Sequence, residues 1–163
     1  MDAYLSSQEE TLFGEFMEGL AIFIGNQVVD THKSKFEGID MQFERGEIIY
    51  LVQIKSGPNW GNSSQIKKLR ENFATAKDLL AQQTDKKVVA INGCCYGREN
   101  SSDKGDYLKL CGQEFWYFIS GDEQLYTQLI EPIGYRAKEK NQAFLETYEI
   151  GRASCRERVC ELV

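Results

Sequence analysis

The chain has 163 residues, of which 42% are hydrophobic and 27% are charged, and this composition is typical of one soluble globular domain. No apolar run is long enough to cross a bilayer, and the start MDAYLSSQEE lacks the basic and apolar regions of a secretory signal, so we expect a cytoplasmic protein. The formal net charge of -6 argues against a large basic surface for nucleic acid, although it leaves room for a nuclease whose basic residues lie in one cleft.

The first half of the chain predicts a helix followed by a β-hairpin. Apolar side chains between residues 8 and 27 recur at intervals of three and four, which indicates an amphipathic helix. Residues 31–37 are polar and are expected to form a connector or the start of a strand. Residues 38–43 and 48–55 are then predicted to be strands, joined by a turn at residues 44–47.

The second half predicts further helices and two strands. Apolar residues from Ile66 to Leu80 lie on one face of a second helix that runs to about residue 83. The run at residues 88–92 is predicted to be a strand buried on both faces, and residues 115–119 a further strand. Two more helices follow, one with Leu125, Leu129, Ile130 and Ile133 inward and a more polar one from residue 135 to about residue 148. This order predicts an α/β sandwich with a central mixed sheet flanked by helices.

The five cysteines are expected to be reduced thiols, because their number is odd and no export signal precedes them. We interpret Cys94, Cys95 and Cys111 as buried apolar side chains. The chain has one histidine, His32, and no CxxC pair, so a structural zinc site is not expected.

The predicted hairpin carries the groups that metal-dependent phosphodiester hydrolysis needs. Gln53 and Lys55 are two apart on the second strand and therefore project from one face, and the turn brings Asp40 beside them. The Asp40 carboxylate, the Gln53 side-chain oxygen and the Ile54 backbone carbonyl are ligands of the kind that hold a hard divalent cation. Lys55 would orient the attacking water or offset charge on the phosphate. The alternative is that Asp40 and Lys55 form an ordinary surface ion pair.

Four stretches of the sequence carry a specific resemblance: EGIDMQF, YLVQIKSGPNWGNSSQIKKLRENF, VVAINGCCYGR and LCGQEFWYFISGDEQLY. They are similar to a family of type II restriction endonucleases within the PD-(D/E)xK nuclease superfamily, whose members cut palindromes of the GG-N-CC type. The similarity covers residues 37–134, and KSGPNWGNSSQ is its most specific part. The resemblance implies a restriction-endonuclease-like sandwich, Mg²⁺ as the cofactor with Mn²⁺ as a substitute, Asp40 as the metal-binding aspartate and Lys55 as the motif lysine.

Gln53 departs from the motif, because it stands where the superfamily has its second acidic residue. The amide oxygen can still bind a cation, but the site loses one negative charge. We therefore expect weaker metal binding or a second acid from elsewhere, for which Glu18 and Glu15 of the first helix are candidates. The alternative for both glutamates is an ordinary solvated helix face.

The loop after Lys55 and the start of the next helix are expected to contact DNA. The candidate residues are Ser56, Asn59, Trp60, Asn62, Ser63, Ser64, Gln65, Lys67, Lys68 and Arg70. Neutral donors at a helix N-terminus favour a phosphate, and the three cations add positive charge. The alternative is a capped helix with a solvated basic face, and for Trp60 a packing anchor rather than a residue that stacks or wedges near a groove. His32 is interpreted as structural or as a DNA contact.

The predicted function is that of a divalent-metal-dependent type II restriction endonuclease, which hydrolyses double-stranded DNA at a short palindromic site as a homodimer. A cognate DNA methyltransferase is expected to be encoded nearby. The alternatives are a catalytically weak DNA-binding relative and a structure-selective or methylation-dependent nuclease of the same fold.

The last residues do not continue this pattern. Residues 150–159, IGRASCRERV, resemble a translated sequencing-library adapter, and a natural basic tail is the alternative. We therefore expect a nuclease domain at residues 1–149, truncated at its C-terminus, and a non-native tail at residues 150–163. On this interpretation Cys155 and Cys160 carry no function, and the natural protein continues beyond Glu149.

Overall fold

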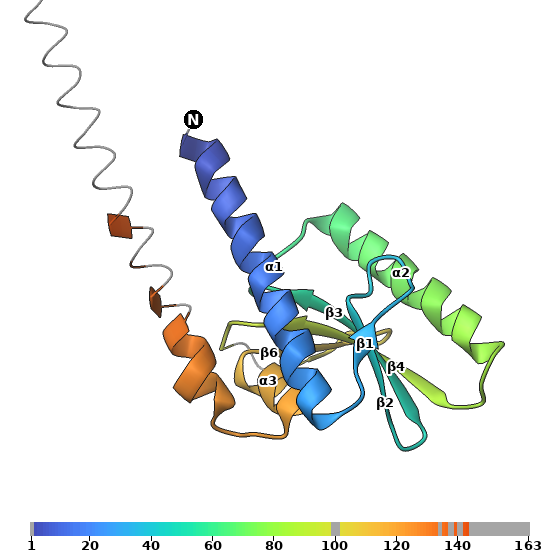
Figure 1. Cartoon of the computed structure of the whole chain (residues 1–163). Coiled ribbons are helices and arrows are strands. Elements are labelled where there is room, and N and C mark those ends of the chain that lie inside the picture. The colour runs from blue at the N-terminus through green and yellow to red at the C-terminus, as the bar shows by residue number, and fades with distance from the viewer. Residues whose placement is uncertain (1, 99–101, 134, 137–138, 140–141, 144–163) are drawn as a thin grey trace, which may run out of the picture. The chain divides into compact units, whose positions relative to one another are not determined.

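A mixed six-stranded sheet forms the centre of the fold (Figure 1). The structure, a computed structural model, describes residues 2–98, 102–133, 135–136, 139 and 142–143. The chain divides into two units, Met1–Tyr126 and Thr127–Val163, and the six strands lie in the first unit. These strands are β1 (His32–Lys33), β2 (Met41–Arg45), β3 (Ile48–Lys55), β4 (Lys87–Cys94), β5 (Ser102–Asp103) and β6 (Leu108–Cys111).

The strand order across the sheet is β1-β2-β3-β4-β6-β5. Strands β1, β2 and β3 pair antiparallel, β4 lies parallel to both β3 and β6, and β5 is antiparallel to β6. The predicted α/β fold with a mixed sheet flanked by helices is therefore confirmed. The hairpin and the strand at residues 88–92 are also confirmed, whereas β5 and β6 have no counterpart in the prediction.

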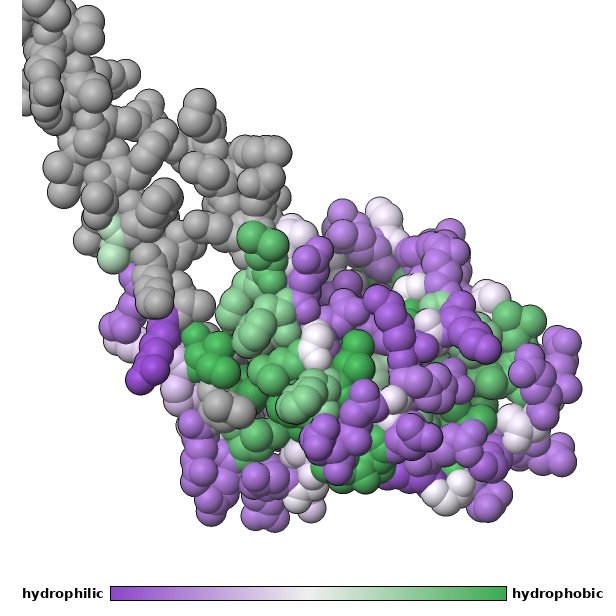
Figure 2. Space-filling model, viewed as in Figure 1, coloured by the Kyte–Doolittle hydropathy of each residue, from purple (hydrophilic) through white to green (hydrophobic). Residues whose placement is uncertain are grey.

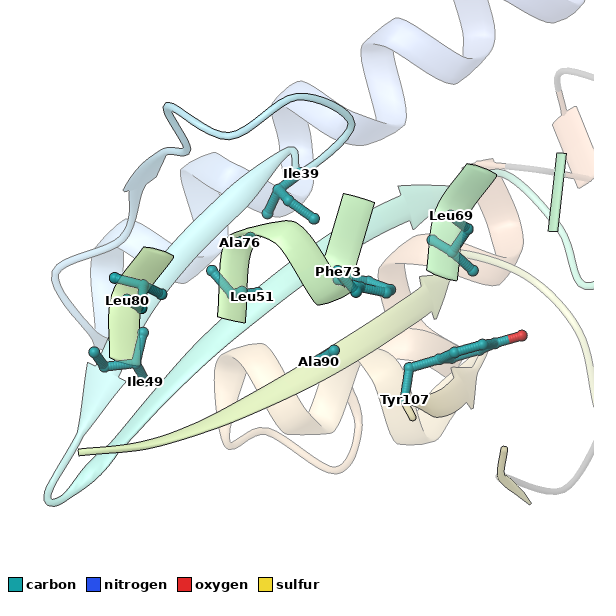
Figure 3. Packing of buried hydrophobic residues seen from close by; sticks show 9 residues of the cluster. All are labelled: Ile39, Ile49, Leu51, Leu69, Phe73, Ala76, Leu80, Ala90 and Tyr107. Carbon is teal, nitrogen blue, oxygen red and sulfur yellow. The ribbon is translucent and has the colours of Figure 1, made fainter. Parts of the chain in front are cut away.

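Helix α2 (Ser63–Ala81) covers one face of the sheet, where the sequence predicts a helix. Asn62 caps it, because its side-chain oxygen accepts the Ser64 and Gln65 N–H groups at 3.0 and 3.1 Å, and the Gln65 side chain accepts the Asn62 N–H at 2.9 Å. The helix then buries an apolar stripe against β3 and β4 (Figure 3). The stripe consists of Leu69, Phe73, Ala76 and Leu80, and it meets Ile49, Leu51 and Ala90. Burial of each large side chain contributes roughly 1.5–3 kcal/mol.

Helices α1 (Asp2–Val28) and α3 (Gln113–Ser120) contact each other on the opposite face. Phe118 of α3 packs on the ring of Tyr50, with centroids 5.1 Å apart, and Tyr50 alternates along β3 with the residues that face α2. In α1 the buried positions include Met17 and Ala21, in agreement with the predicted amphipathic helix. The two layers of helices therefore sandwich the sheet.

The predicted strand at residues 115–119 is wrong, because these residues belong to helix α3. The aromatic run Phe115–Phe118 has strong β-propensity, but burial of Phe115, Trp116 and Ile119 against the sheet follows helical spacing. Gly121 ends the helix in the left-handed region (φ +72°), and its N–H donates to the Tyr117 carbonyl at 2.7 Å. Besides β3, the strand that pairs with β4 is β6, which the sequence pattern did not indicate.

The first strand of the hairpin is shifted from its predicted bounds of residues 38–43 to Met41–Arg45. Gly38 lies in a turn with φ +69°, and a Cβ there would sit 2.1 Å from the Asn72 side-chain nitrogen of α2. Gly38 is thus a turn residue that lets the chain pass close to α2 before it enters the strand. The expected connector at residues 31–37 contains the short strand β1.

Several remaining expectations concern the rest of the chain. Residues 125–133 are helical, with a π-helical turn at Tyr126–Ile130, where the sequence predicts a helix. The expected helix at residues 135–148 lies largely outside the described residues, and the expected tail at residues 150–163 lies entirely outside them.

None of the described helices is long and apolar enough to cross a membrane. Cys94, Cys95 and Cys111 are buried thiols, as expected, and burial raises the pKa of Cys95 far above its usual range.

Candidate active site

Asp40 directly precedes β2 and continues the pairing of β2 with β3 by one residue. Met41 pairs with Val52, and the Asp40 N–H donates to the Val52 carbonyl at 2.9 Å. Asp40 and Met41 thus both lie opposite Val52, and Asp40 lies beside the end of β3. The Asp40 carboxylate accepts the Ile54 N–H at 2.6 Å, in place of a bond between two backbones. The structure thus brings Asp40 to the end of β3, as the sequence predicts.

The surroundings of Asp40 raise the pKa of its carboxyl group from 3.8 to about 6. Burial is the largest cause, because a surrounding of low dielectric constant disfavours the ionised form. The hydrogen bond from Ile54 opposes this shift, and the negative charge of Glu18 adds to it. The positive charges of Lys55 and Lys33 oppose it in turn. Asp40 is therefore close to several charged groups from different parts of the chain.

Of the two glutamates of α1 that the sequence offers as a second acid, Glu18 comes near the site. It acts on the pKa of Asp40, and its Oε1 lies 3.8 Å from Lys33 Nζ. Glu15 has an exposed side chain and is not among the charges that shift Asp40. The structure thus brings Glu18 to the site and leaves Glu15 on the solvated face of the helix.

Gln53 is buried, with 9% of its surface exposed, and it projects from the face of the sheet that carries Ile49 and Leu51. Among the described residues, Gln53 Oε1 is the one buried side-chain nitrogen or oxygen that has no hydrogen-bond partner. An unpaired buried oxygen costs roughly 1–3 kcal/mol, so it indicates a partner outside the described residues. The Ile54 carbonyl points to the same side of β3 as the Ile54 N–H, which is the side of Asp40.

The oxygens of Asp40, Gln53 and Ile54 are suited to a hard divalent cation such as Mg²⁺ or Mn²⁺. Within the described part of the chain, no group of three or more His, Cys, Asp or Glu side chains could hold a metal by itself. A cation at Asp40 would therefore keep several positions for water and substrate oxygens. This is the usual pattern of magnesium bound to proteins.

Lys55 ends β3 on the same face as Gln53. Its Nζ lies 5.2 Å from the centre of the Trp60 ring, a cation–π distance. Lys55 also lines a cavity of about 510 Å³, together with Phe13, Ser56, Gly57, Pro58, Asn59 and Trp60. An ammonium group in an open cavity next to a carboxylate is placed to act on a bound anion.

The whole chain can be compared with models of known protein families. Residues 1–141 match the family described as type II restriction endonuclease EcoO109I. The chain belongs to this family. No curated protein matches the chain. Membership of the EcoO109I family confirms the resemblance seen in the sequence, and the α/β architecture agrees with a restriction-endonuclease-like fold.

In this member of the EcoO109I family, the loop after Lys55 is held firmly to the body of the protein. The Trp60 Nε1–H donates to Asn92 Oδ1 at 3.0 Å, and the ring packs against the apolar core under α2. Asn62 and Gln65 use their side-chain oxygens in the cap of α2. These contacts favour the structural alternative for these three residues. Ser56 is half-buried, and the side chains of Asn59, Ser63 and Ser64 are exposed.

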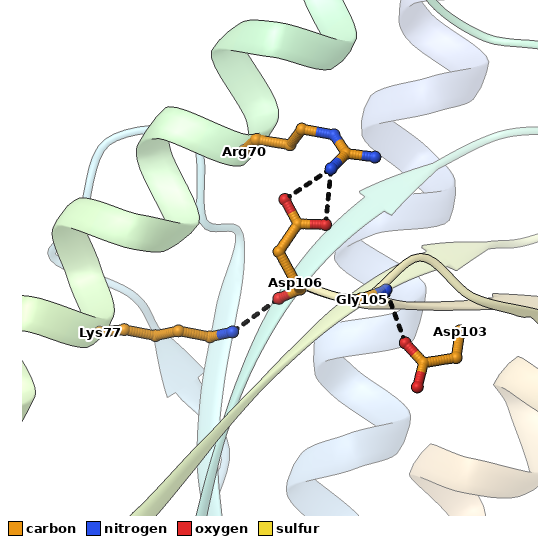
Figure 4. A network of polar contacts seen from close by, with 5 residues as sticks. All are labelled: Arg70, Lys77, Asp103, Gly105 and Asp106. Atoms are coloured by element: carbon orange, nitrogen blue, oxygen red, sulfur yellow. Dashed lines mark hydrogen bonds and ion pairs between the residues drawn. The ribbon is translucent and has the colours of Figure 1, made fainter.

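The predicted basic cluster on α2 is paired with acidic groups. Arg70 binds both carboxylate oxygens of Asp106 at 2.8 and 2.9 Å, and Lys77 donates to the Asp106 carbonyl at 2.6 Å (Figure 4). Lys67 and Lys68 are exposed and pair with Glu71 at 3.8 Å and Glu37 at 3.1 Å. Arg70 therefore fixes the segment before β6 onto α2, whereas Lys67 and Lys68 make weak surface pairs that a phosphate can replace. His32 is exposed in the edge strand β1, opposite Gln42.

Asn92 is a residue of this site that the sequence analysis did not single out. It is fully buried on β4, in register with Gln53, and its Nδ2 lies 3.5 Å from the Gln53 carbonyl. The signal was a polar residue at the end of the apolar run VVAIN. A buried asparagine in a central strand needs partners, and Trp60 supplies one.

Proposed function

We propose that this member of the EcoO109I family is a divalent-metal-dependent endonuclease, which hydrolyses phosphodiester bonds of double-stranded DNA at a short palindromic site. The observation that carries the proposal is the unpaired buried oxygen of Gln53, next along β3 to Ile54, whose N–H the Asp40 carboxylate accepts. Both lie at an end of the sheet that also holds the Lys55 ammonium and an open cavity. This arrangement suits a cation on one side and a phosphate on the other.

In this proposal Asp40, Gln53 and the Ile54 carbonyl hold Mg²⁺, for which Mn²⁺ can substitute. The bound cation would neutralise charge on the scissile phosphate and lower the pKa of a coordinated water. Lys55 offsets negative charge that builds up on the phosphate as the water attacks. Glu18 supplies near Asp40 the second negative charge that Gln53 lacks.

The DNA backbone is proposed to run over the cavity beside Lys55. Ser56, Asn59 and Trp60 line this cavity, and Ser63, Lys67 and Lys68 follow on the first turns of α2. Asn62 and Gln65 contribute by fixing the helix end, where the positive end of the helix dipole favours a phosphate. The recognition of bases falls to other side chains.

A homodimer is part of the proposal, because cleavage of both strands of a palindrome calls for two related active sites. A band of hydrophobic side chains lies along α1 (Figure 2), and its exposed members are Leu12, Phe16 and Phe23, at 65%, 52% and 62% exposure. With Gly19 they recur at intervals of four, three and four residues, the pattern of a seam between two packed helices. We propose α1 of a second copy as the partner of this seam, and a cytoplasmic setting with a cognate DNA methyltransferase encoded nearby.

The test is cleavage of supercoiled plasmid and long linear DNA by the purified chain, with and without Mg²⁺, together with its mass in solution. Discrete fragments that need Mg²⁺ or Mn²⁺ support a restriction endonuclease. DNA binding without cleavage would indicate a catalytically weak relative. The neutral Gln53 in place of an acidic residue is consistent with this alternative. Smearing or cutting confined to junctions or methylated sites would contradict a simple restriction activity.

A further inference from the structure

Trp60 links a fully buried residue to the proposed active-site lysine. On its edge, the indole Nε1–H donates to Asn92 Oδ1 at 3.0 Å, and Asn92 has no exposed surface. On its face, the ring centre lies 5.2 Å from Lys55 Nζ. One aromatic side chain thus connects the interior of β4 with the ammonium group at the end of β3.

The loop that carries Trp60 is fixed at several points. The Tyr96 N–H donates to the Ser56 carbonyl at 2.9 Å, and Lys109 Nζ donates to the Pro58 carbonyl at 3.0 Å. Trp60 itself packs against the apolar core under α2. The ring therefore has little freedom to leave Lys55 or to turn toward DNA.

A lysine at this position needs such support. Its ammonium stands at the end of a flexible four-carbon stem, and each rotatable bond costs conformational entropy when the group is held in one place. An aromatic face within about 6 Å attracts an ammonium group and narrows the positions that it samples. Because the ring is anchored through Asn92, the attraction is directed to one place in the cavity.

We propose that Trp60 is a positioning residue, which holds the Lys55 ammonium in place for the reacting phosphate, and that Asn92 fixes Trp60. This inference rests on the proposed function. It assigns Trp60 a role in the rate of cleavage through Lys55 and none in the binding of DNA by stacking or wedging.

The test compares Trp60→Met, which removes the ring, with Trp60→Phe, which keeps an aromatic face. Single-turnover cleavage of a plasmid that the wild type cuts, at saturating enzyme and Mg²⁺, is expected to slow about tenfold in Trp60→Met, in line with the loss of one cation–π contact. Trp60→Phe keeps the aromatic face but loses the bond to Asn92, so it is expected to recover part of the rate. Tyr117→Met, which removes an exposed ring of α3, is the matched control and should cleave like the wild type.

Two further measurements separate this role from others. The affinity for the same DNA in EDTA should stay within about twofold in each Trp60 variant, because a positioning residue does not contact DNA. In NMR spectra the ε-methylene protons of Lys55 should lose their ring-current shift in Trp60→Met, and the Trp60 indole N–H signal should move in Asn92→Ala. The NMR result stands even where cleavage is slow, and Asn92→Ala provides a second variant if Trp60→Met folds poorly.

The outcomes are distinct. Unchanged cleavage in Trp60→Met, while Lys55→Ala is inactive, would overturn the positioning role. Loss of DNA affinity with an unchanged rate at saturation would show that Trp60 contacts DNA, and would overturn it as well. Wild-type cleavage by Lys55→Ala would instead contradict the proposed active site.

Discussion

One face of β3 has two halves with opposite character. Ile49 and Leu51 lie under α2 among apolar side chains (Figure 3), whereas the next two residues on this face, Gln53 and Lys55, carry a buried amide oxygen without a partner and an ammonium group beside the Trp60 ring. The first half has no polar side-chain atoms to pair, and its burial under α2 stabilises the fold. The second half, which together with the neighbouring Asp40 we call the polar half, keeps an oxygen without a partner, and the Asp40 carboxyl group has a raised pKa. Both features oppose folding at neutral pH. Unfavourable polar groups within a well-packed sheet are typical of a site that binds a ligand.

The largest expected effect comes from removing charge in the polar half. Asp40→Ala and Lys55→Ala should each lower the rate of DNA cleavage at least about 10³-fold, because lost charge stabilisation costs several kcal/mol of barrier. Single-turnover plasmid cleavage in Mg²⁺ measures this effect. DNA affinity in EDTA should change little, and both variants should remain folded. Cleavage at the wild-type rate in either variant would contradict the site.

The apolar half should respond in the opposite way. Phe73→Ala leaves a cavity under α2 and should lower the free energy of unfolding by about 3–5 kcal/mol, measured by urea denaturation. The folded fraction at low temperature should still cleave at the wild-type rate. A selective loss of cleavage without a loss of stability would mean that the two halves are not separate.

At Gln53, substitutions are expected to change the stability of the metal-free protein and the cleavage of DNA in opposite directions. Gln53→Leu removes the unpaired oxygen and should stabilise the metal-free protein by about 1–3 kcal/mol while impairing cleavage. Gln53→Glu restores the usual acid and should lower the Mg²⁺ concentration for half-maximal cleavage, whereas Gln53→Ala should raise it. If all three variants keep the metal dependence of the wild type, Gln53 is not a ligand.

The raised pKa of Asp40 gives a smaller effect that depends on pH. A carboxyl group whose pKa rises from 3.8 to about 6 on folding stabilises the protein fully only below pH 3.8, and this stability is lost as the pH rises through 6. The side chain in Asp40→Asn does not ionise, so this variant should not lose stability as the pH rises. In EDTA, the free energy of unfolding of Asp40→Asn should exceed that of the wild type by about 1–2 kcal/mol above pH 6, and the two should be equal near pH 4. A shift of two pKa units corresponds to roughly 3 kcal/mol, and contact of the carboxyl group with solvent reduces this value. Thermal melts across this range provide the measurement. Mg²⁺ at pH 8 should stabilise the wild type and leave Asp40→Asn unchanged.

The smallest expected effect concerns the C-terminal residues. If residues 150–163 are a translated adapter, nothing has selected them to pack, and their deletion should leave the melting temperature within about one degree. Differential scanning calorimetry of the shortened and full chains makes the comparison. A clear drop in melting temperature would contradict the adapter interpretation.

The sequence predicts those parts of the fold in which local pattern and tertiary packing agree. The helical stripe of α2 and the β-branched run of β3 are such cases: β3 was predicted at its observed bounds, and the end of α2 within two residues. The run Phe115–Phe118 is the opposite case, because its aromatic residues favour a strand while their helical spacing buries Phe115 and Trp116. Strands β5 and β6 are too short to carry a pattern of their own.

The candidate site was predictable where it lies within one hairpin. Asp40, Gln53 and Lys55 are brought together by the turn between β2 and β3, and their spacing alone indicates it. Asn92 comes from a strand that follows α2, so its place opposite Gln53 depends on the parallel pairing of β3 with β4. The helix cap at Asn62 and Gln65 was foreseen as an alternative to DNA contact, and geometry was needed to favour it.

The different separations along the chain have a consequence for the order of assembly. The Asp40–Ile54 contact spans 14 residues, whereas the Trp60–Asn92 contact spans 32 and closes only after α2 has crossed from β3 to β4. Short loops close faster and at a lower entropic cost than long ones. On a growing polypeptide the proposed oxygen ligands are therefore expected to meet first, and Trp60 gains its bond to Asn92 only after β4 has been synthesised. A nascent chain that stops before β4 would carry the proposed ligands without the residue that fixes the ring beside Lys55.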